Sequence, residues 1–422
     1  MRKILIAFLL LTFLCSCSAS QFQYPTDNTY HAGTDYQYNM YSQTAIYNIT
    51  DSGEGYYFWV PFCLLYIDKA SMTAVPVCSK PNCRHYEETD AERYALCDAF
   101  IQPVEGNVHL FWNEGNLYAI QRAAQDRKFY ELVKISPDGS RREILHQLGE
   151  VLIISGAVTH RGYLYAALTY YDENMKTHCG IWKYSLNNPS EKPIQLLELQ
   201  SRGSKEVLHN MTAYGNHLYF CMYVNDDIYD GLFVSCDIQT GELQEIMATD
   251  DGFKTTEVTF VDGKLLVLRS NATQENTALD GENQFAPFQI WLCDIDGSNP
   301  RLLGNNYGTV LSDGEYIYRG GFLWIEDGED HFLHIYDADY NELDTVDLCL
   351  IPGITTPWMF AYYPTMDDRV LILTSSKGEK RFRLYWFDKS QIGSGAIEVH
   401  PVMDFEDEYR GAFAHGGTLK IK

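Results

Sequence analysis

The sequence is short of positive charge. Its 422 residues include 32 lysines and arginines against 57 aspartates and glutamates, so the formal net charge at pH 7 is −25. Nucleic-acid-binding proteins take much of their affinity from lysine and arginine contacts with phosphates. The charge balance therefore argues against a nucleic-acid partner, and anionic headgroups and polyanions are repelled for the same reason.

Long apolar runs are also missing, apart from one at the start of the chain. Residues Ile4 to Leu14 are apolar except for Thr12, and they follow the positive residues Arg2 and Lys3. This pattern is typical of a signal peptide. The run of eleven residues is too short to cross a bilayer, which needs about 20.

The run ends in Leu14-Cys15-Ser16-Cys17, which resembles the bacterial lipobox. The resemblance implies that residues 1–16 are a lipoprotein signal peptide and that Cys17 becomes the lipid-modified first residue. The protein is then held at the extracytoplasmic face of the cell membrane. An ordinary secretory peptide cut nearby is the alternative. Removal of the leader takes away two basic residues. The mature chain then has 30 basic and 57 acidic side chains, a formal charge of −27.

Several catalytic motifs are absent from the sequence. There is no Gly-x-Ser-x-Gly nucleophile elbow, no phosphate-binding loop and no dinucleotide fingerprint. These absences argue against an appended serine-hydrolase domain and against nucleotide chemistry. They leave open an enzyme whose carboxylates come together only in the folded chain, such as a glycosidase or lyase.

Aliphatic residues are scarce between Ser18 and Gln43, where Ser, Gln, Tyr, Asn, Asp and Thr prevail. Such a segment buries too little apolar surface to offset its ordering entropy. We expect residues 17–43 to be a flexible tether and residues 44–422 to fold as one domain.

The remainder of the chain is repetitive. An apolar and aromatic phrase recurs as LLYIDK at 64, YELVKI at 130, IWKYSL at 181, LFVSCD at 232, IWLCDI at 290, LHIYDA at 333 and LYWFDK at 384. Successive copies begin 66, 51, 51, 58, 43 and 51 residues apart. A period near 50 residues indicates a propeller or a solenoid.

Each copy also has internal order. A hairpin with a tight polar turn precedes the phrase, as in VTFVDGKLLVL from Val258, and a second tight turn follows it, as in DIDGSNPRLL from Asp294. Four antiparallel strands per copy are a propeller blade. The sequence therefore predicts an all-β, seven-bladed β-propeller, with eight blades as the alternative. We expect the last residues, Arg410 to Lys422, to pair with the first blade around Ala45 to Val60 and so to close the ring.

Propeller geometry sorts the connections onto two faces. Turns between the first and second and between the third and fourth strands form one side, the short-turn face. Loops between the second and third strands and between blades form the other, the long-loop face. Because binding groups favour variable loops on a rigid scaffold, we expect the ligand on the long-loop face. Its candidate residues are Tyr170, Tyr171, Asp172, Tyr223, Asp226, Asp227, Trp324, Asp327 and Trp358.

The first blade-to-blade connection contains four potential metal ligands within a stretch of twenty residues, 78–97. Cys78, Cys83, His85 and Cys97 form a Cys3His set, which satisfies tetrahedral zinc and predicts a structural zinc site. The spacing Cys-x4-Cys-x-His-x11-Cys is not a common zinc pattern, and an exported protein also uses cysteines in disulfides. A disulfide among these cysteines is therefore the alternative. Removing Cys15 and lipidating Cys17 leaves nine cysteines, an odd number.

The phrase DIDGSNPRLL resembles the turn and outer strand of TolB-type and dipeptidyl-peptidase-type propellers. Together with the lipobox and VPVCSKPNCRH, the mature chain resembles lipid-anchored β-propeller lipoproteins of Gram-positive, largely anaerobic bacteria. The resemblance implies architecture and location. We expect a monomeric, membrane-tethered protein that binds a protein, peptide or glycan without catalysis. The alternative is a carbohydrate-active enzyme with carboxylates at the propeller mouth.

Overall fold

The structure is a computed structural model that describes residues 24–31, 34–35, 48–60, 62–85, 88, 90–101, 109–123, 129–199, 208–223, 231–247, 253–270, 288–306, 309–320, 331–406 and 420–421. Regular structure in these residues is almost entirely β-strand. The named helical elements there are α2 (Ala91–Tyr94) and the 3-10 turns η3 (Leu348–Leu350) and η4 (Lys389–Gln391). No helix in this part of the chain is long and apolar enough to cross a membrane. The all-β prediction is confirmed.

Consecutive strands are antiparallel neighbours, and four of the sheets hold four strands each. The first sheet holds β1 (Ile49–Asp51), β2 (Gly55–Val60), β3 (Cys63–Asp68) and β4 (Thr73–Pro76). Another holds β12 (Leu208–Tyr214), β13 (His217–Tyr223), β14 (Gly231–Asp237) and β15 (Leu243–Glu245). The next two hold β16 (Lys254–Val261), β17 (Lys264–Ser270), β18 (Phe288–Cys293) and β19 (Arg301–Asn306), and then β20 (Thr309–Ser312), β21 (Ile317–Gly320), β22 (Phe332–Tyr336) and β23 (Glu342–Asp347).

A seven-stranded sheet joins two of the expected four-strand units. It holds β5 (His109–Asn113), β6 (Asn116–Arg122), β7 (Phe129–Ile135), β8 (Arg142–His160), β9 (Tyr163–Tyr171), β10 (Thr177–Ser185) and β11 (Ile194–Leu199). The first part of β8 pairs with β7 as a fourth strand, and its second part pairs with β9 as a first strand. Register shifts interrupt both pairings, so the 19-residue strand bends between the two units.

The last sheet corrects the expected mode of closure. It holds β24 (Pro357–Pro364), β25 (Arg369–Ser376), β26 (Arg381–Asp388), β27 (His400–Glu406) and β28 (Lys420–Ile421). Of the C-terminal residues expected to pair with the first sheet, the structure describes Lys420 and Ile421, and these pair with β27 instead. The physical reason is that residues 49–76 already supply all four strands of the first sheet.

All seven repeated phrases lie on the third strand of a four-strand unit: β3, β7, β10, β14, β18, β22 and β26. Consecutive residues of the third strand are buried, such as Leu64 and Leu65 in β3 or Leu132 and Val133 in β7, so the strand needs apolar side chains on both faces. That requirement explains why the phrase is the most regular feature of the repeat.

Packing between sheets follows from the alternation of side chains along each strand. All six residues of β2 are buried, and successive side chains point to opposite faces. Tyr57 stacks on Trp112 of β5 with ring centroids 5.5 Å apart, whereas Phe58 meets Phe405 of β27 at 6.4 Å. The first sheet therefore packs against both the second and the last.

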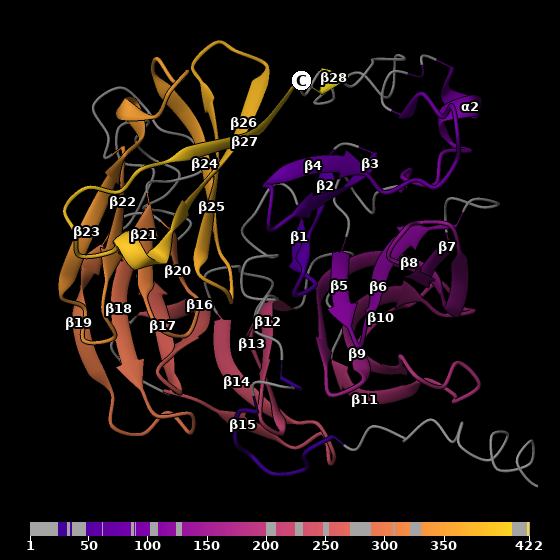
Figure 1. Cartoon of the computed structure of the whole chain (residues 1–422). Coiled ribbons are helices and arrows are strands. Elements are labelled where there is room, and N and C mark those ends of the chain that lie inside the picture. The colour runs from indigo at the N-terminus through magenta and orange to yellow at the C-terminus, as the bar shows by residue number, and fades with distance from the viewer. Residues whose placement is uncertain are drawn as a thin grey trace, which may run out of the picture.

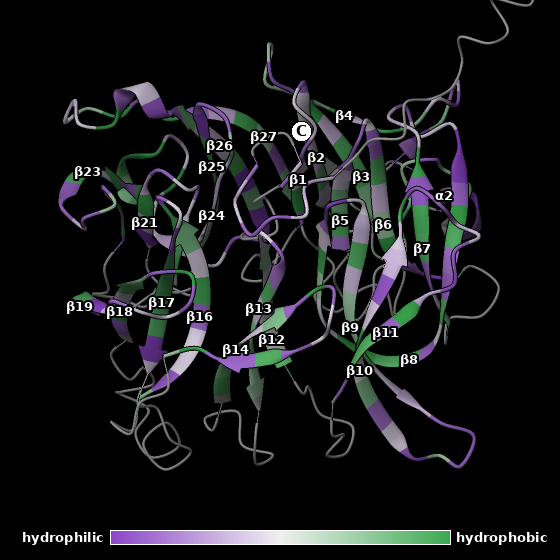
Figure 2. Ribbon diagram, turned by 90° about the horizontal axis from the view of Figure 1, so that it is seen from below, coloured by the Kyte–Doolittle hydropathy of each residue, from purple (hydrophilic) through white to green (hydrophobic). Residues whose placement is uncertain are grey.

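The other sheets contact one another in sequence order, through β8 with β12, β14 with β16, β16 with β20, and β21 with β24. Figure 1 shows them arranged around a common centre, with β27 beside β4. Hydrophobic residues run along the strands and hydrophilic ones gather at the connections (Figure 2). Antiparallel four-strand units packed face to face in this way are consistent with a β-propeller.

The expected leader, Cys17 and most of the expected tether lie outside the described residues. The described part of the tether, Tyr24–His31 with Thr34 and Asp35, packs against the sheets, although we expected a flexible segment. Asp35 is 1% exposed and pairs with Arg161, which is also buried.

Candidate metal centre

The connection after β4 is tied at both ends to the first residues of β3. Near its start, the Val77 amide donates to the Leu64 carbonyl at 2.9 Å. Near its end, the Leu64 amide donates to the Ala99 carbonyl at 2.7 Å, and Phe100 forms a β-bridge with Cys63. Both ends of the connection therefore lie beside the same short stretch of the first sheet.

The short helix α2 closes the connection on itself. Asp90 caps its N-terminus by accepting hydrogen bonds from the Glu92 and Arg93 amides at 3.0 and 3.1 Å. The Cys97 amide then donates to the Tyr94 carbonyl at 2.9 Å. The helix thus turns the chain back, so that Cys97 faces the residues that follow β4.

These constraints bring the four predicted ligands together. The ligand atoms of Cys78, Cys83, His85 and Cys97 all lie within 4.8 Å of one another, and Cys97 Sγ is 3.5 Å from His85 Nδ1. Cys97 is buried and the other three are half-buried. A tetrahedral zinc with Zn–S and Zn–N bonds of about 2.3 and 2.1 Å has ligand-to-ligand edges of about 3.5–3.8 Å. The set is therefore close to the geometry that zinc requires.

The electrostatics of the cluster favour a bound cation. Burial raises the pKa of the Cys97 thiol, and the neighbouring thiols of Cys83 and Cys78 raise it further. Three thiolates cannot accumulate there without a compensating positive charge. A zinc ion with three thiolates and one imidazole carries one net negative charge, and Lys80 and Arg142 interact electrostatically with the cysteines.

A fifth cysteine borders the cluster and was not part of the sequence prediction. Cys63 is fully buried in β3, and burial raises its pKa to about 12, with smaller contributions from Cys78 and Cys83. The apolar context of the sequence around Cys63 gave no sign of this proximity. Cys63 contributes an apolar wall behind the ligands.

None of the nine described cysteines is bonded as a disulfide. Cys179, Cys221, Cys236 and Cys293 are buried within strands, where a cysteine packs as a small apolar residue. Cys349 is the exposed one among them. Among the described residues, the Cys3His set is the group of potential metal ligands that brings three cysteines together.

The end of β9 and the β9–β10 loop carry the three ligand-face candidates whose side chains the structure describes, Tyr170, Tyr171 and Asp172. Tyr170 stacks on His178 with centroids 5.8 Å apart. Asp172 Oδ2 lies 3.1 Å from His178 Nε2, while its Oδ1 accepts hydrogen bonds from the Asn174 and Lys176 amides. Asp172 therefore shapes its own turn. Tyr171, 38% exposed, is the more accessible of the two tyrosines.

The side chains of the other ligand-face candidates lie outside the described part of the structure. Tyr223 lies at the end of β13 and Trp358 lies in β24, with side chains outside the described part of the structure. Asp226, Asp227, Trp324 and Asp327 lie outside the described residues altogether.

A second group of donor atoms lies near η3. His331, Asp347 and Cys349 each place a ligand atom within 4.8 Å of the others, and His331 Nε2 is 3.5 Å from Asp347 Oδ1. The same Oδ1 accepts a hydrogen bond from the Cys349 amide at 2.8 Å, so it also caps the 3-10 turn. Three exposed or half-buried donors form a weaker set than the Cys3His cluster.

Among the acids of the described strands, Glu257 of β16 has an unusual environment. It keeps some contact with solvent but is surrounded by protein, and this burial raises its pKa to about 7. No neighbouring charge contributes to the shift. A carboxyl group with such a pKa suits proton transfer at neutral pH, although a glycosidase site needs a second carboxyl group nearby.

No protein-family model and no curated protein matches the sequence. Solved structures do match the fold. One is an oligogalacturonate lyase in complex with manganese, with a TM-score of 0.50 and 11% identity over 84% of this chain and 89% of that one. A prolyl endopeptidase matches with a TM-score of 0.53 and 12% identity over 86% of this chain and 51% of that one.

A puromycin-hydrolyzing peptidase of Mycobacterium tuberculosis matches with a TM-score of 0.51 and 11% identity over 90% of this chain and 56% of that one. This chain spans about half the length of each peptidase. The lyase and the prolyl endopeptidase are β-propeller proteins, which supports the propeller fold. At these identities the likeness concerns the fold alone.

Proposed function

We propose that the protein is a monomeric, seven-bladed β-propeller, anchored by a lipid on Cys17 at the extracytoplasmic face of the cell membrane. It binds a protein, peptide or glycan on the long-loop face and performs no catalysis. A structural zinc ion bound by Cys78, Cys83, His85 and Cys97 fixes one of the loops of that face.

The convergence of the four ligand atoms within 4.8 Å is the observation that carries this proposal. Three thiolates and one imidazole fill the coordination sphere of zinc, whereas a catalytic zinc keeps one position open for water or substrate. The role of the metal is therefore mechanical. Manganese prefers oxygen ligands, so the thiolate set differs in chemistry from a manganese site.

Seven blades are supported by the seven third strands and by the packing of the first sheet against the last. In this arrangement β8 serves two adjacent blades. Within the described residues, the ring is then closed by side chains between the first and last blades, without a shared strand.

Capture from solubilised cell envelope tests the binding function. Three baits are compared: the mature protein, a Tyr171→Ala, Met175→Ala variant altered on the long-loop face, and a Ser190→Ala variant altered on the short-turn face. Met175 is 71% exposed in the β9–β10 loop. We expect one component to be retained by the first and third baits and lost by the second. Equal capture by all three contradicts a long-loop binding site, and capture by none contradicts a binding function.

A carbohydrate-active enzyme is the second candidate. The raised pKa of Glu257 and the fold likeness to a lyase support it. The assay incubates the mature protein with oligogalacturonate, with and without manganese, and follows the unsaturated product by its ultraviolet absorbance. The first proposal predicts no turnover. Turnover that is lost in Glu257→Gln and kept in Glu242→Gln, an exposed control, favours the enzyme.

A further inference from the structure

The N-terminal residues Tyr24–His31, Thr34 and Asp35, here called the docked segment, cross the short-turn face. The Tyr24 hydroxyl donates to Glu114 in the β5–β6 turn and accepts a hydrogen bond from Asn187 in the β10–β11 turn at 3.3 Å. The Asn28 side chain accepts a hydrogen bond from the Asn216 amide in the β12–β13 turn at 3.2 Å. Each of these turns belongs to the short-turn face.

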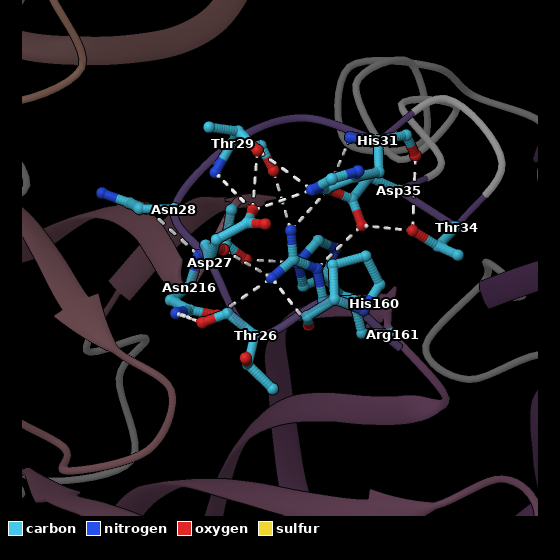
Figure 3. Close-up of polar contacts among 12 residues, drawn as sticks. Thr26, Asp27, Asn28, Thr29, His31, Thr34, Asp35, His160, Arg161 and Asn216 are labelled. Carbon is cyan, nitrogen blue, oxygen red and sulfur yellow. Dashed lines mark hydrogen bonds and ion pairs between the residues drawn. The ribbon is translucent and has the colours of Figure 1, made fainter. Parts of the chain in front are cut away.

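Arg161 of the β8–β9 turn holds the docked segment at its centre (Figure 3). It is 4% exposed, and its guanidinium grips the Asp35 carboxylate through two hydrogen bonds of 2.9 and 2.8 Å. The remaining N–H groups donate to the carbonyls of Pro25, Asp27 and Thr29 and to the Asn216 side chain, at 2.8 to 3.1 Å. One buried guanidinium therefore forms hydrogen bonds with four residues of the segment.

The turns are shaped to receive the segment. Gly162 and Gly215 both have positive φ, and a Cβ on either would collide with the segment, at Tyr24 and Asn28 respectively. Tyr30 stacks on Tyr214 at 6.0 Å. Burial opposes ionisation of Asp35, but the hydrogen bonds from Arg161 outweigh it, so the pKa of Asp35 is lowered. Asp35 therefore stays ionised at neutral pH.

Docking shortens the free tether. Tyr24 follows Cys17 by seven positions, a reach of at most about 25 Å when the chain is fully extended. Without docking, the next described residue, Asn48, lies 31 residues from Cys17, a reach of about 105 Å. A strand of seven residues spans about 23 Å. The height of a blade is therefore nearly equal to the greatest reach between Cys17 and Tyr24 in the docked state. In Figure 1 the indigo docked segment and α2 lie at opposite sides of the molecule.

We infer that the docked segment fixes the orientation of the protein on the membrane. The short-turn face is turned toward the lipid surface, and the long-loop face, with the Cys3His cluster, is turned away from it. This inference rests on the proposed attachment at Cys17. Arg161 is the positioning residue.

Energy transfer from the protein to labelled lipid headgroups tests the orientation. A synthetic lipid thioester is ligated to Cys17 as the N-terminal residue of the chain 17–422, and the product is reconstituted in phosphatidylcholine vesicles. A donor dye is introduced as an unnatural amino acid at Ser190 on the short-turn face or at Met175 on the long-loop face of the same unit. The chemical ligation makes this experiment independent of lipidation in cells, which is tested separately by the mass of the N-terminal peptide.

We expect transfer from position 190 to exceed transfer from position 175 several-fold. Arg161→Met and, from the segment side, Asp35→Ala should bring the two efficiencies together, whereas the exposed control Arg141→Met should keep them apart. Circular dichroism shows whether each variant is folded, and Asp35→Ala replaces no residue of a strand. Equal transfer in the unaltered protein overturns the orientation, and a difference that persists in both Asp35→Ala and Arg161→Met overturns the role of the docked segment.

Discussion

Lys69 of the first sheet and Asp367 of the last form an ion pair in which Nζ lies 2.8 Å from Oδ2. Lys69 also pairs with Asp51 at 2.7 Å and lies 4.7 Å from the centre of the Tyr56 ring, whose hydroxyl donates to Asp367 at 2.6 Å. No strand joins the two sheets within the described residues. Side chains therefore provide the connection where the first and last units meet.

Lys69→Met tests this connection. The substitution removes the cation shared by two half-buried carboxylates and leaves them facing each other. We expect the free energy of unfolding to fall by about 2–4 kcal/mol, measured by urea denaturation. Lys192→Met, at an exposed turn lysine, is the control and should change stability by less than about 0.5 kcal/mol. A change as small as that of the control would show that the ion pairs do not hold the sheets together.

The same pair predicts a dependence on acid. Burial opposes ionisation of Asp367, but hydrogen bonds from Lys69, Thr365 and Tyr56 outweigh it, so its pKa is lowered. Its stabilising contribution is present above the unfolded pKa of about 3.9 and disappears as pH falls through the lower folded pKa. The difference in stability between the unaltered protein and Lys69→Met should therefore shrink below about pH 4. A difference that is constant down to pH 2 would contradict the assignment.

Glu257 predicts the opposite pH dependence. Burial raises its pKa to about 7, above the unfolded value of about 4.3. The folded state binds the proton more tightly, so stability is lost as pH rises from about 4 to 7. Glu257→Gln should remove this loss. In urea denaturation at pH 8, the free energy of unfolding of this variant should exceed that of the unaltered protein by about 1–3 kcal/mol. The exposed control Glu242→Gln should not, and equal stability of all three proteins at pH 8 would contradict the buried environment.

The metal cluster predicts a selective effect of cysteine substitution. Cys83→Ser should lower the zinc content of anaerobically purified protein from about one per chain, whereas Cys349→Ser should leave it unchanged. Proteolysis should then begin within residues 77–101 in Cys83→Ser, because the loop loses its attachment. Full zinc content in Cys83→Ser would contradict the Cys3His assignment.

The repeat was predictable from the sequence because third strands are buried on both faces and leave a strong apolar signal, from LLYIDK at 64 to LYWFDK at 384. The proximity of Cys78, Cys83, His85 and Cys97 was also predictable, since the four residues lie close in sequence. The β8 strand was not predicted to run through two units, because its junction around Gly149 resembles an ordinary loop. The proximity of Cys63 to the cluster depends on the tertiary fold.

The docked segment shows most clearly what local composition misses. Its few apolar residues predicted a flexible tether, because ordering such a chain gains little from hydrophobic burial. The compensation comes from Arg161, 126 residues away from its partner Asp35. An ion pair between residues so distant leaves no periodic pattern in the sequence.

X-ray absorption at the zinc edge of the anaerobically purified mature protein tests the central claim most directly. The account predicts one zinc per chain with three sulfur ligands at about 2.3 Å and one nitrogen ligand at about 2.0–2.1 Å. Protein without bound metal, or with a disulfide between any two of Cys78, Cys83 and Cys97, would contradict it.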